Sequence, residues 1–179
     1  MSLIRERTVT GEGLKDIAVK MMIAARTAPK GRGQDNLIMQ IAEGASIEKL
    51  ANRMNEIADS YDQAFFRRDA ENILRSQVIL LMGTTIEPLG LVKCGMCGYE
   101  NCAEKRKHPD VPCVFNTGDL GIAVGSAVST AMQYKADNRI MYTVGQAAMD
   151  LKFFEPEVKI AYGIPLSAES KNLFFDRKK

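Results

Sequence analysis

The chain has 179 residues, of which 46% are hydrophobic and 26% are charged, and its formal net charge at pH 7 is +2. This length fits one domain, and the small, evenly spread charge argues against nucleic acid or an anionic membrane as a partner. No apolar run approaches the ~20 residues that span a bilayer. The charged start, Arg5-Glu6-Arg7, lacks the apolar segment of a signal peptide, so we expect a cytoplasmic protein.

The first half of the chain predicts three helices and two strands. In chain order these are a helix at 11–27, a strand at 37–42, helices at 46–61 and 65–76, and a strand at 78–82. We expect Ser46 to cap the second helix and Tyr61 to lie on its buried face. Both strands are expected to be buried, and the second is apolar on both faces, as a central strand should be.

After a cysteine-rich segment, the sequence predicts a helix over 120–132 that Thr117 or Asp119 caps. Almost every residue of this helix is apolar or small, so we expect it to be buried on all sides. A glycine inside a helix costs about 1 kcal/mol. Gly121 and Gly125 therefore predict that a neighbouring helix or a flat ligand packs closely against that face.

The C-terminal third predicts two more strands with a short helix between them. These elements are a strand at 139–144, a helix at 146–153 and a strand at 158–164. Gly163 and Pro165 are expected to end the last strand. The apolar group at 173–175 stands in a polar tail, and we expect it to be buried, with a second subunit as one way of covering it.

All four cysteines lie within a window of twenty residues, at Cys94, Cys97, Cys102 and Cys113, with the spacing C-x2-C-x4-C-x10-C. In a reducing compartment, grouped cysteines more often indicate a metal than disulfides. A [4Fe–4S] cluster takes four thiolates, and glycines next to such ligands let backbone N–H groups approach the sulfides. An iron–sulfur cluster is therefore the leading interpretation of this segment.

Zinc is the first alternative. A structural zinc site with four cysteines normally uses two C-x2-C knuckles, and Cys102 with Cys113 would make a poor second one. His108, the single histidine of the chain, could serve as a ligand beside three cysteines. Redox-active or incidental thiols are the remaining alternative.

The segment 94–102 resembles a four-cysteine iron–sulfur domain found in electron-transfer subunits and corrinoid proteins, which has the pattern C-x2-C-G-x3-C and a distant fourth cysteine. The whole chain is similar to a prokaryotic family described only as containing a ferredoxin domain. That similarity runs nearly end to end, through 94–102, 119–127 and 161–166. It implies an iron–sulfur segment, residues 91–115, carried within a single domain, residues 1–179.

A weaker resemblance suggests the scaffold. Residues 24–29, with the Gly-rich loop and the strand after them, resemble the flavin-binding opening of nitroreductases. The helix after Asp119 resembles their buried central helix, and 160–165 resembles their last core strand. The resemblance implies an α+β fold, with a central mixed sheet of about four strands flanked by helices, and a homodimer.

The same resemblance implies an FMN site. Its expected contacts are Arg26, Lys30, Arg32, Gly33 and Gly163, with Lys30 and Arg32 meeting the flavin phosphate. The sequence also departs from the nitroreductase pattern, because Gly33 and Asp35 stand where those proteins carry amide side chains that meet the flavin ring. A solvent-exposed turn with two charges is the alternative interpretation of this loop, and the fold can occur without flavin.

We therefore expect an iron–sulfur electron-transfer protein, with FMN-dependent oxidoreductase activity as an open question. The alternative function is a non-enzymatic protein with a structural zinc site and a scaffold that has lost flavin. A third hypothesis is a flavoenzyme in which the cysteines are ancillary. With one histidine, no Ser-His-Asp arrangement is credible, and the sequence names neither catalytic residues, a substrate nor a redox partner.

Overall fold

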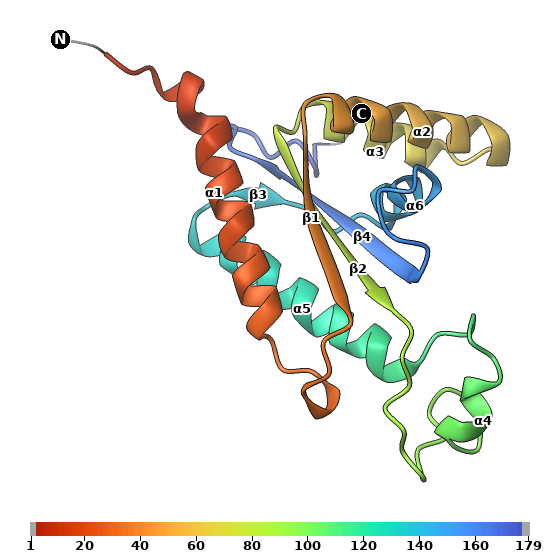
Figure 1. The fold of residues 1–179 in the computed structure, drawn as a ribbon. Helices are drawn as coiled ribbons and strands as arrows, with labels where there is room; N and C mark the ends of the chain where they lie inside the picture. The colour runs from red at the N-terminus through yellow and green to blue at the C-terminus, as the bar shows by residue number, and fades with distance from the viewer. Residues whose placement is uncertain (1–2, 177–179) are drawn as a thin grey trace.

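A four-stranded antiparallel sheet forms the centre of the fold, with the strand order β1-β2-β4-β3 (Figure 1). The computed structural model describes residues 3–176. The strands are β1 (Leu37–Glu43), β2 (Val78–Thr85), β3 (Asp137–Asn138) and β4 (Val158–Ser167). The helices are α1 (Glu6–Thr27), α2 (Ala45–Tyr61), α3 (Ala64–Leu74), α4 (Cys102–Arg106), α5 (Val114–Gln133) and α6 (Tyr142–Asp150), with a short 3₁₀ turn η1 (Gly31–Gly33) after α1.

Helices cover both faces of the sheet, α2, α3 and α6 on one side and α1 and α5 on the other (Figure 1). Each layer has its own buried core. The side chains of β2 alternate between them: Ile79 and Leu81 lie in the first core, and Leu80 and Met82 lie in the second. The α+β prediction and the central position of this strand are therefore confirmed.

The sheet differs from the expected mixed sheet, because every strand pair is antiparallel. The connection between β1 and β2 explains this for the first pair. It consists of α2 and α3, which pack against each other, so the chain returns to the end of the sheet that it left. β1 also lies at the edge of the sheet and is only half-buried over most of its length, so the prediction that it is buried was wrong.

The expected strand at 139–144 is wrong. β3 is only two residues long, Met141 makes an isolated bridge with Gly163, and α6 begins at the next residue, Tyr142. β4 continues through Gly163 and Pro165, which were expected to end it. Gly163 is needed inside the strand because a Cβ there would lie 2.2 Å from Cγ1 of Val144 in α6.

Several local predictions about the helices also differ from the structure. Gly44, at φ 53°, caps α2 and Ser46 lies inside it, while Tyr61 is 70% exposed. The first helix begins at Glu6, since Gly11 and Gly13 continue it. The expected caps of the helix over 120–132 are wrong too, because α5 begins before both.

One face of α5 is exposed in the described chain, contrary to the expected burial on all sides. Ile122 is 49% exposed, and a Cβ at Gly121 or Gly125 would meet nothing within 4 Å. Of the apolar group at 173–175, Leu173 and Phe174 lie in the core of their own chain and need no second subunit to cover them. Phe175, by contrast, is 60% exposed, so the expected burial is wrong for this residue. Within residues 3–176, no helix is long and apolar enough to cross a membrane.

Candidate metal centre

The four cysteines lie in a lobe beyond the end of β2, which we call the cysteine lobe (residues 91–113). Figure 1 shows it around α4, apart from the sheet and next to the start of α5. Cys102 is the first residue of α4, and Cys113 is the residue that immediately precedes α5; both are buried. Cys94 and Cys97 are half-buried, and all four thiols are free.

The Cys94–Cys97 pair sits on a tight turn that depends on glycine. Gly95 and Gly98 have φ values of 72° and 87°, which side-chain-bearing residues rarely adopt. The N–H of Gly98 donates to the carbonyl of Gly95 at 3.0 Å. The turn thus holds two thiols on a short, closely folded segment.

The start of α5 provides a favourable place for a negative sulfur. α5 is 20 residues long, and the N-terminus of a helix carries a partial positive charge from its aligned peptide dipoles. Cys113 occupies the cap position of this helix, and its carbonyl accepts the N–H of Thr117 at 3.1 Å. Cys113 therefore stands beside the positively polarised end of a long helix.

The chemistry of the donor set fits an iron–sulfur cluster or zinc, since both bind cysteine thiolates. The structure does not bring the thiols together: within residues 3–176, no three Cys, His, Asp or Glu side chains are placed to share a metal ion. A bound metal would have to draw the half-exposed pair toward the buried pair, and metal binding can supply free energy for such ordering. His108, the alternative ligand, stacks on Tyr99 with ring centroids 4.8 Å apart.

The lobe is fastened to the rest of the chain through a short stem, residues 87–89. Asn116, in α5, has a buried side chain that makes two hydrogen bonds to the backbone of Glu87. Its amide oxygen accepts the Glu87 N–H at 2.9 Å, and its amide nitrogen donates to the Glu87 carbonyl at 3.2 Å. Arg106, in α4, donates to the carbonyl of Pro88 at 3.1 Å. Arg32, in η1, donates to the carbonyl of Leu89 at 2.9 Å.

The cations expected at a flavin phosphate are engaged with protein groups. Lys30 donates from Nζ to the carbonyls of Ala25, Arg26 and Ala28 at 3.1, 2.7 and 3.0 Å, which caps the end of α1. Arg26 lies 2.7 Å from a carboxylate oxygen of Asp35. As they stand, these side chains do not fit a phosphate, because each would first have to leave its partner.

The glycines of the expected flavin site have structural roles as well. Gly33 adopts φ 68° in an exposed turn, and Gly163 is required by the packing of Val144 described above. The N–H of Gly31 is taken by the carboxylate of Asp119, with N···O distances of 3.0 and 3.1 Å. Asp119 is thus not a helix cap but a link from α5 to η1.

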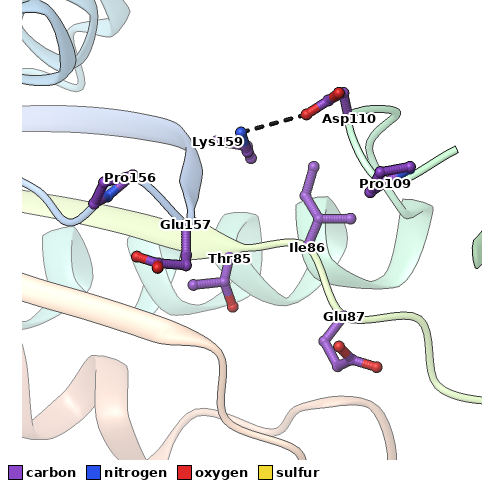
Figure 2. A pocket seen from close by; sticks show the side chains of 8 residues that line it. All are labelled: Thr85, Ile86, Glu87, Pro109, Asp110, Pro156, Glu157 and Lys159. Atoms are coloured by element: carbon purple, nitrogen blue, oxygen red, sulfur yellow. Dashed lines mark ion pairs between the residues drawn. The ribbon is translucent and has the colours of Figure 1, made fainter.

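A cavity of about 510 Å³ lies where the cysteine lobe meets the sheet (Figure 2). Its lining comes from the end of β2, the lobe and the start of β4, and consists of Thr85, Ile86, Glu87, Pro109, Asp110, Pro156, Glu157 and Lys159. Figure 2 shows Lys159 and Asp110 paired across it, at 3.4 Å. The cavity has the size of a small-molecule site.

Two residues of this region were missed from the sequence. Nothing in the sequence context of Asn116 marks it as the clamp of the stem. Lys105 stands in a charged stretch of the sequence, 104–107, yet its side chain is buried. The one available signal was its position three residues after Cys102, on the same face of a helix.

The fold is that of the nitroreductases. A nitroreductase with bound FMN from Desulfitobacterium hafniense is similar with a TM-score of 0.60 at 14% identity, over 95% of this chain and 81% of that one. A BluB-like flavoprotein from Clostridium difficile gives a TM-score of 0.58 at 17% identity, over 99% of this chain and 87% of that one. An FMN-dependent nitroreductase from Mycobacterium smegmatis, in complex with NADPH, gives 0.58 at 10% identity, over 87% and 78%.

Sequence comparison identifies the family. Residues 109–177 match a family described as "uncharacterized protein containing a ferredoxin domain (DUF2148)". A protein of Archaeoglobus fulgidus, described as an uncharacterized protein, is 40% identical over 182 residues, which cover 98% of this chain and 97% of that protein. The chain belongs to this ferredoxin-domain family. The matched segment includes Cys113 and lies C-terminal to the other three cysteines.

Proposed function

We propose that this chain is an iron–sulfur electron-transfer protein in which Cys94, Cys97, Cys102 and Cys113 hold a [4Fe–4S] cluster. The observation that carries the proposal is that all four cysteines are free thiols in one lobe. Membership in a family with a ferredoxin domain supports it. When bound, such a cluster accepts and releases one electron at a time.

Each part of the chain has a defined task in this proposal. The glycine turn presents one pair of thiols to solvent, where a redox partner can approach. Cys102 and Cys113 would hold the other side of the cluster at the N-terminal ends of two helices, α4 and α5. The stem contacts of Arg32, Arg106 and Asn116 fasten the lobe to the sheet and to α5.

Replacement of one ligand tests the proposal. Cys97→Ser should abolish the broad visible absorption of anaerobically prepared protein, because a hydroxyl is a poor substitute for a thiolate on iron. Met96→Ala is the matched control, since Met96 is 67% exposed in the same turn and offers no ligand to the cluster. Equal absorption of Cys97→Ser and wild type would overturn the assignment.

A second candidate function, FMN-dependent oxidoreduction, is favoured by the likeness to structures that contain FMN. Its expected contacts are Arg26, Lys30, Arg32, Gly33 and Gly163. Flavin binding would require Lys30 and Arg26 to exchange their present partners for a phosphate. Flavin bands in the spectrum of purified protein, which persist in Cys97→Ser, would support this function, and their absence would exclude it.

Zinc is the alternative occupant of the lobe. It would make the cysteine lobe a structural staple in a protein without a redox role. A colourless protein that holds about one zinc ion per chain, and whose lobe unfolds with a chelator, would support this alternative.

We also propose that the chain is one domain, with the iron–sulfur segment at 91–115, and that two copies associate through the exposed face of α5. Three large apolar side chains are about half exposed, Ile122 and Met132 on α5 and Ile23 on the adjoining α1. Exposed apolar side chains that lie together are typical of an interface between subunits. We also propose a cytoplasmic location, where glutathione keeps thiols reduced and available for a metal.

A further inference from the structure

Lys105 is the most deeply buried charged residue that the structure describes, with 1% of its surface exposed. Lysine is almost never fully buried unless it is paired, because moving an ammonium out of water costs several kcal/mol. A lysine in this position therefore needs a compensating negative charge or an extensive set of acceptors.

Within the described part of the chain, the ammonium of Lys105 has one hydrogen-bond acceptor. Its Nζ donates to the carbonyl of His108 at 2.9 Å. Three carboxylates in or beside the lobe pair with other cations: Glu104 with Lys107 at 2.7 Å, Asp110 with Lys159 at 3.4 Å, and Glu87 with Arg106 at 3.7 Å. Among residues 3–176, no ion pair to Lys105 is formed.

The position of Lys105 relates its charge to the cysteines. Cys102 begins α4, and Lys105 follows it by three residues, so the two side chains share one face of this helix. Both are buried, at 8% and 1% exposure. The His108 carbonyl lies in the turn after α4 and holds the ammonium inside the lobe.

We propose that Lys105 is the internal counter-cation of the tetrathiolate centre and raises its reduction potential. This inference rests on the proposed function. A cluster held by four thiolates is anionic, and it gains one further negative charge when a one-electron donor reduces it, with no ligand lost. A buried cation in a low-dielectric interior favours the reduced, more negative state of the cluster. Lys105 therefore makes the centre easier to reduce.

The test compares midpoint potentials of anaerobic, cluster-loaded protein by spectroelectrochemical titration. Lys105→Met should shift the midpoint to a more negative value, at both low and high salt, because a buried charge is poorly screened. Lys107→Met is the matched control: Lys107 lies two residues away with a 69% exposed side chain, and its replacement should leave the midpoint close to wild type at high salt. An unchanged midpoint in Lys105→Met overturns the proposal.

Lys105→Gln separates charge from hydrogen bonding, because the amide can still donate to the His108 carbonyl. It should shift the midpoint in the same direction as Lys105→Met. A wild-type midpoint in Lys105→Gln assigns the effect to the hydrogen bond and overturns the proposal. Unfolding of both metal-free variants, under conditions in which metal-free wild type stays folded by circular dichroism, also overturns it, since Lys105 would then be structural.

The failure of the proposed function gives a different result. Wild-type protein without iron and sulfide would refute the cluster, and the charge argument would then apply to Zn²⁺, whose tetrathiolate complex is also anionic. In that case Lys105→Gln should bind Zn²⁺ about tenfold more weakly or worse in a competition titration, given the size of close charge effects. Equal zinc affinity would overturn the role of Lys105 as well.

Discussion

Asp119, in the second turn of α5, accepts the backbone N–H of Gly31 between its two carboxylate oxygens, at 3.0 and 3.1 Å. Gly31 lies in η1, and a Cβ at this position would approach Leu89 of the stem to 2.9 Å. One buried carboxylate thus joins α5 to η1, and η1 in turn lies against the stem of the cysteine lobe. The Gly-rich loop that resembles the flavin-binding opening of nitroreductases is part of this junction.

Removal of the Asp119 carboxylate should destabilise the protein. Asp119→Ala leaves the Gly31 N–H without its acceptor, which predicts a loss of about 1–3 kcal/mol in the free energy of unfolding. Urea denaturation measures it. Asp16→Ala, which removes an exposed carboxylate of α1, is the control and should change stability by less than about 0.5 kcal/mol. An equal loss in the free energy of unfolding in the two variants would refute the stabilising role of this junction.

Loss of the Asn116 side chain should make the backbone of the stem and the cysteine lobe open more often. Asn116→Ala leaves the N–H and carbonyl of residue 87 unpaired, and it should raise amide hydrogen exchange across 87–113. Thr143→Val is the matched control. It removes a buried hydrogen bond of 2.9 Å to Asp69 in the other layer, so it should destabilise the protein without selective exchange in the lobe. The same exchange pattern in both variants would argue that the Asn116 hydrogen bonds do not stabilise the lobe locally.

The Arg26–Asp35 pair predicts a pH-dependent contribution to stability. Partial burial acts to raise the pKa of Asp35, but hydrogen bonds from Arg26 and the Leu37 N–H, with the charges of Arg26 and Lys30, outweigh it and leave the pKa below its ordinary value. A lowered folded pKa stabilises the protein fully above the unfolded carboxyl value of about 3.9. The contribution is lost as the pH falls through the folded value.

Arg26→Met should therefore cost more stability near pH 6 than near pH 2.5, with about 0.5–1 kcal/mol at the higher pH because the pair is partly exposed. Urea midpoints at the two pH values provide the measurement. A cost that is the same at both pH values would show that the loss comes from contacts of Arg26 that do not depend on pH, such as its hydrogen bond to the Leu37 carbonyl at 3.1 Å, and not from the ion pair.

Gly121→Ala tests the proposed homodimer. In the described chain a Cβ at Gly121 meets nothing within 4 Å, so alanine should stabilise the isolated chain by about 1 kcal/mol through helix propensity. Across a closely packed dimer interface the same methyl group would weaken association. Sedimentation velocity should show more monomer in Gly121→Ala than in wild type.

Gly13→Ala is the matched control, because Gly13 is also an exposed glycine inside a helix, α1, with nothing within 4 Å. It should give the same gain in stability with no change in association. A Gly121→Ala protein that associates like Gly13→Ala would exclude this face of α5 as the interface.

Regular periodicity accounts for the parts of the fold that the sequence predicted well. The stripe Ile47, Leu50, Ala51 and Met54 repeats at helical steps, and all four are buried in α2. The run at 78–82 is apolar on both faces and forms the centre of the sheet. Such patterns depend on a single element and its layer, so they can be found without knowledge of the rest of the chain.

Tertiary packing accounts for the errors. Residues 139–144 have strand-like composition, yet α6 begins at Tyr142, and a Cβ at Gly145 would lie 1.9 Å from the Ala161 carbonyl. The close approach of α6 to β4 thus depends on two glycines, Gly145 and Gly163, that lie on different elements. Neither glycine shows by itself what it will contact.

The candidate site likewise combines features that the sequence predicts with features that depend on tertiary contacts. The spacing of the cysteines predicts a shared segment, and the φ values of Gly95 and Gly98 agree with the turn that this spacing needs. The clamp at Asn116 depends on contacts from outside the motif, so the sequence could not show it. For the burial of Lys105, the spacing from Cys102 was the one signal that the sequence offered. Lys30 has a charge suitable for a phosphate, and only the structure shows that it caps α1.

The most direct test of the central claim is iron and acid-labile sulfide analysis of anaerobically purified wild-type protein, with visible spectra before and after dithionite. The account predicts about four iron and four sulfide per chain, with a visible band that bleaches on reduction. Zinc in place of iron, or thiols without any metal or sulfide, would contradict it.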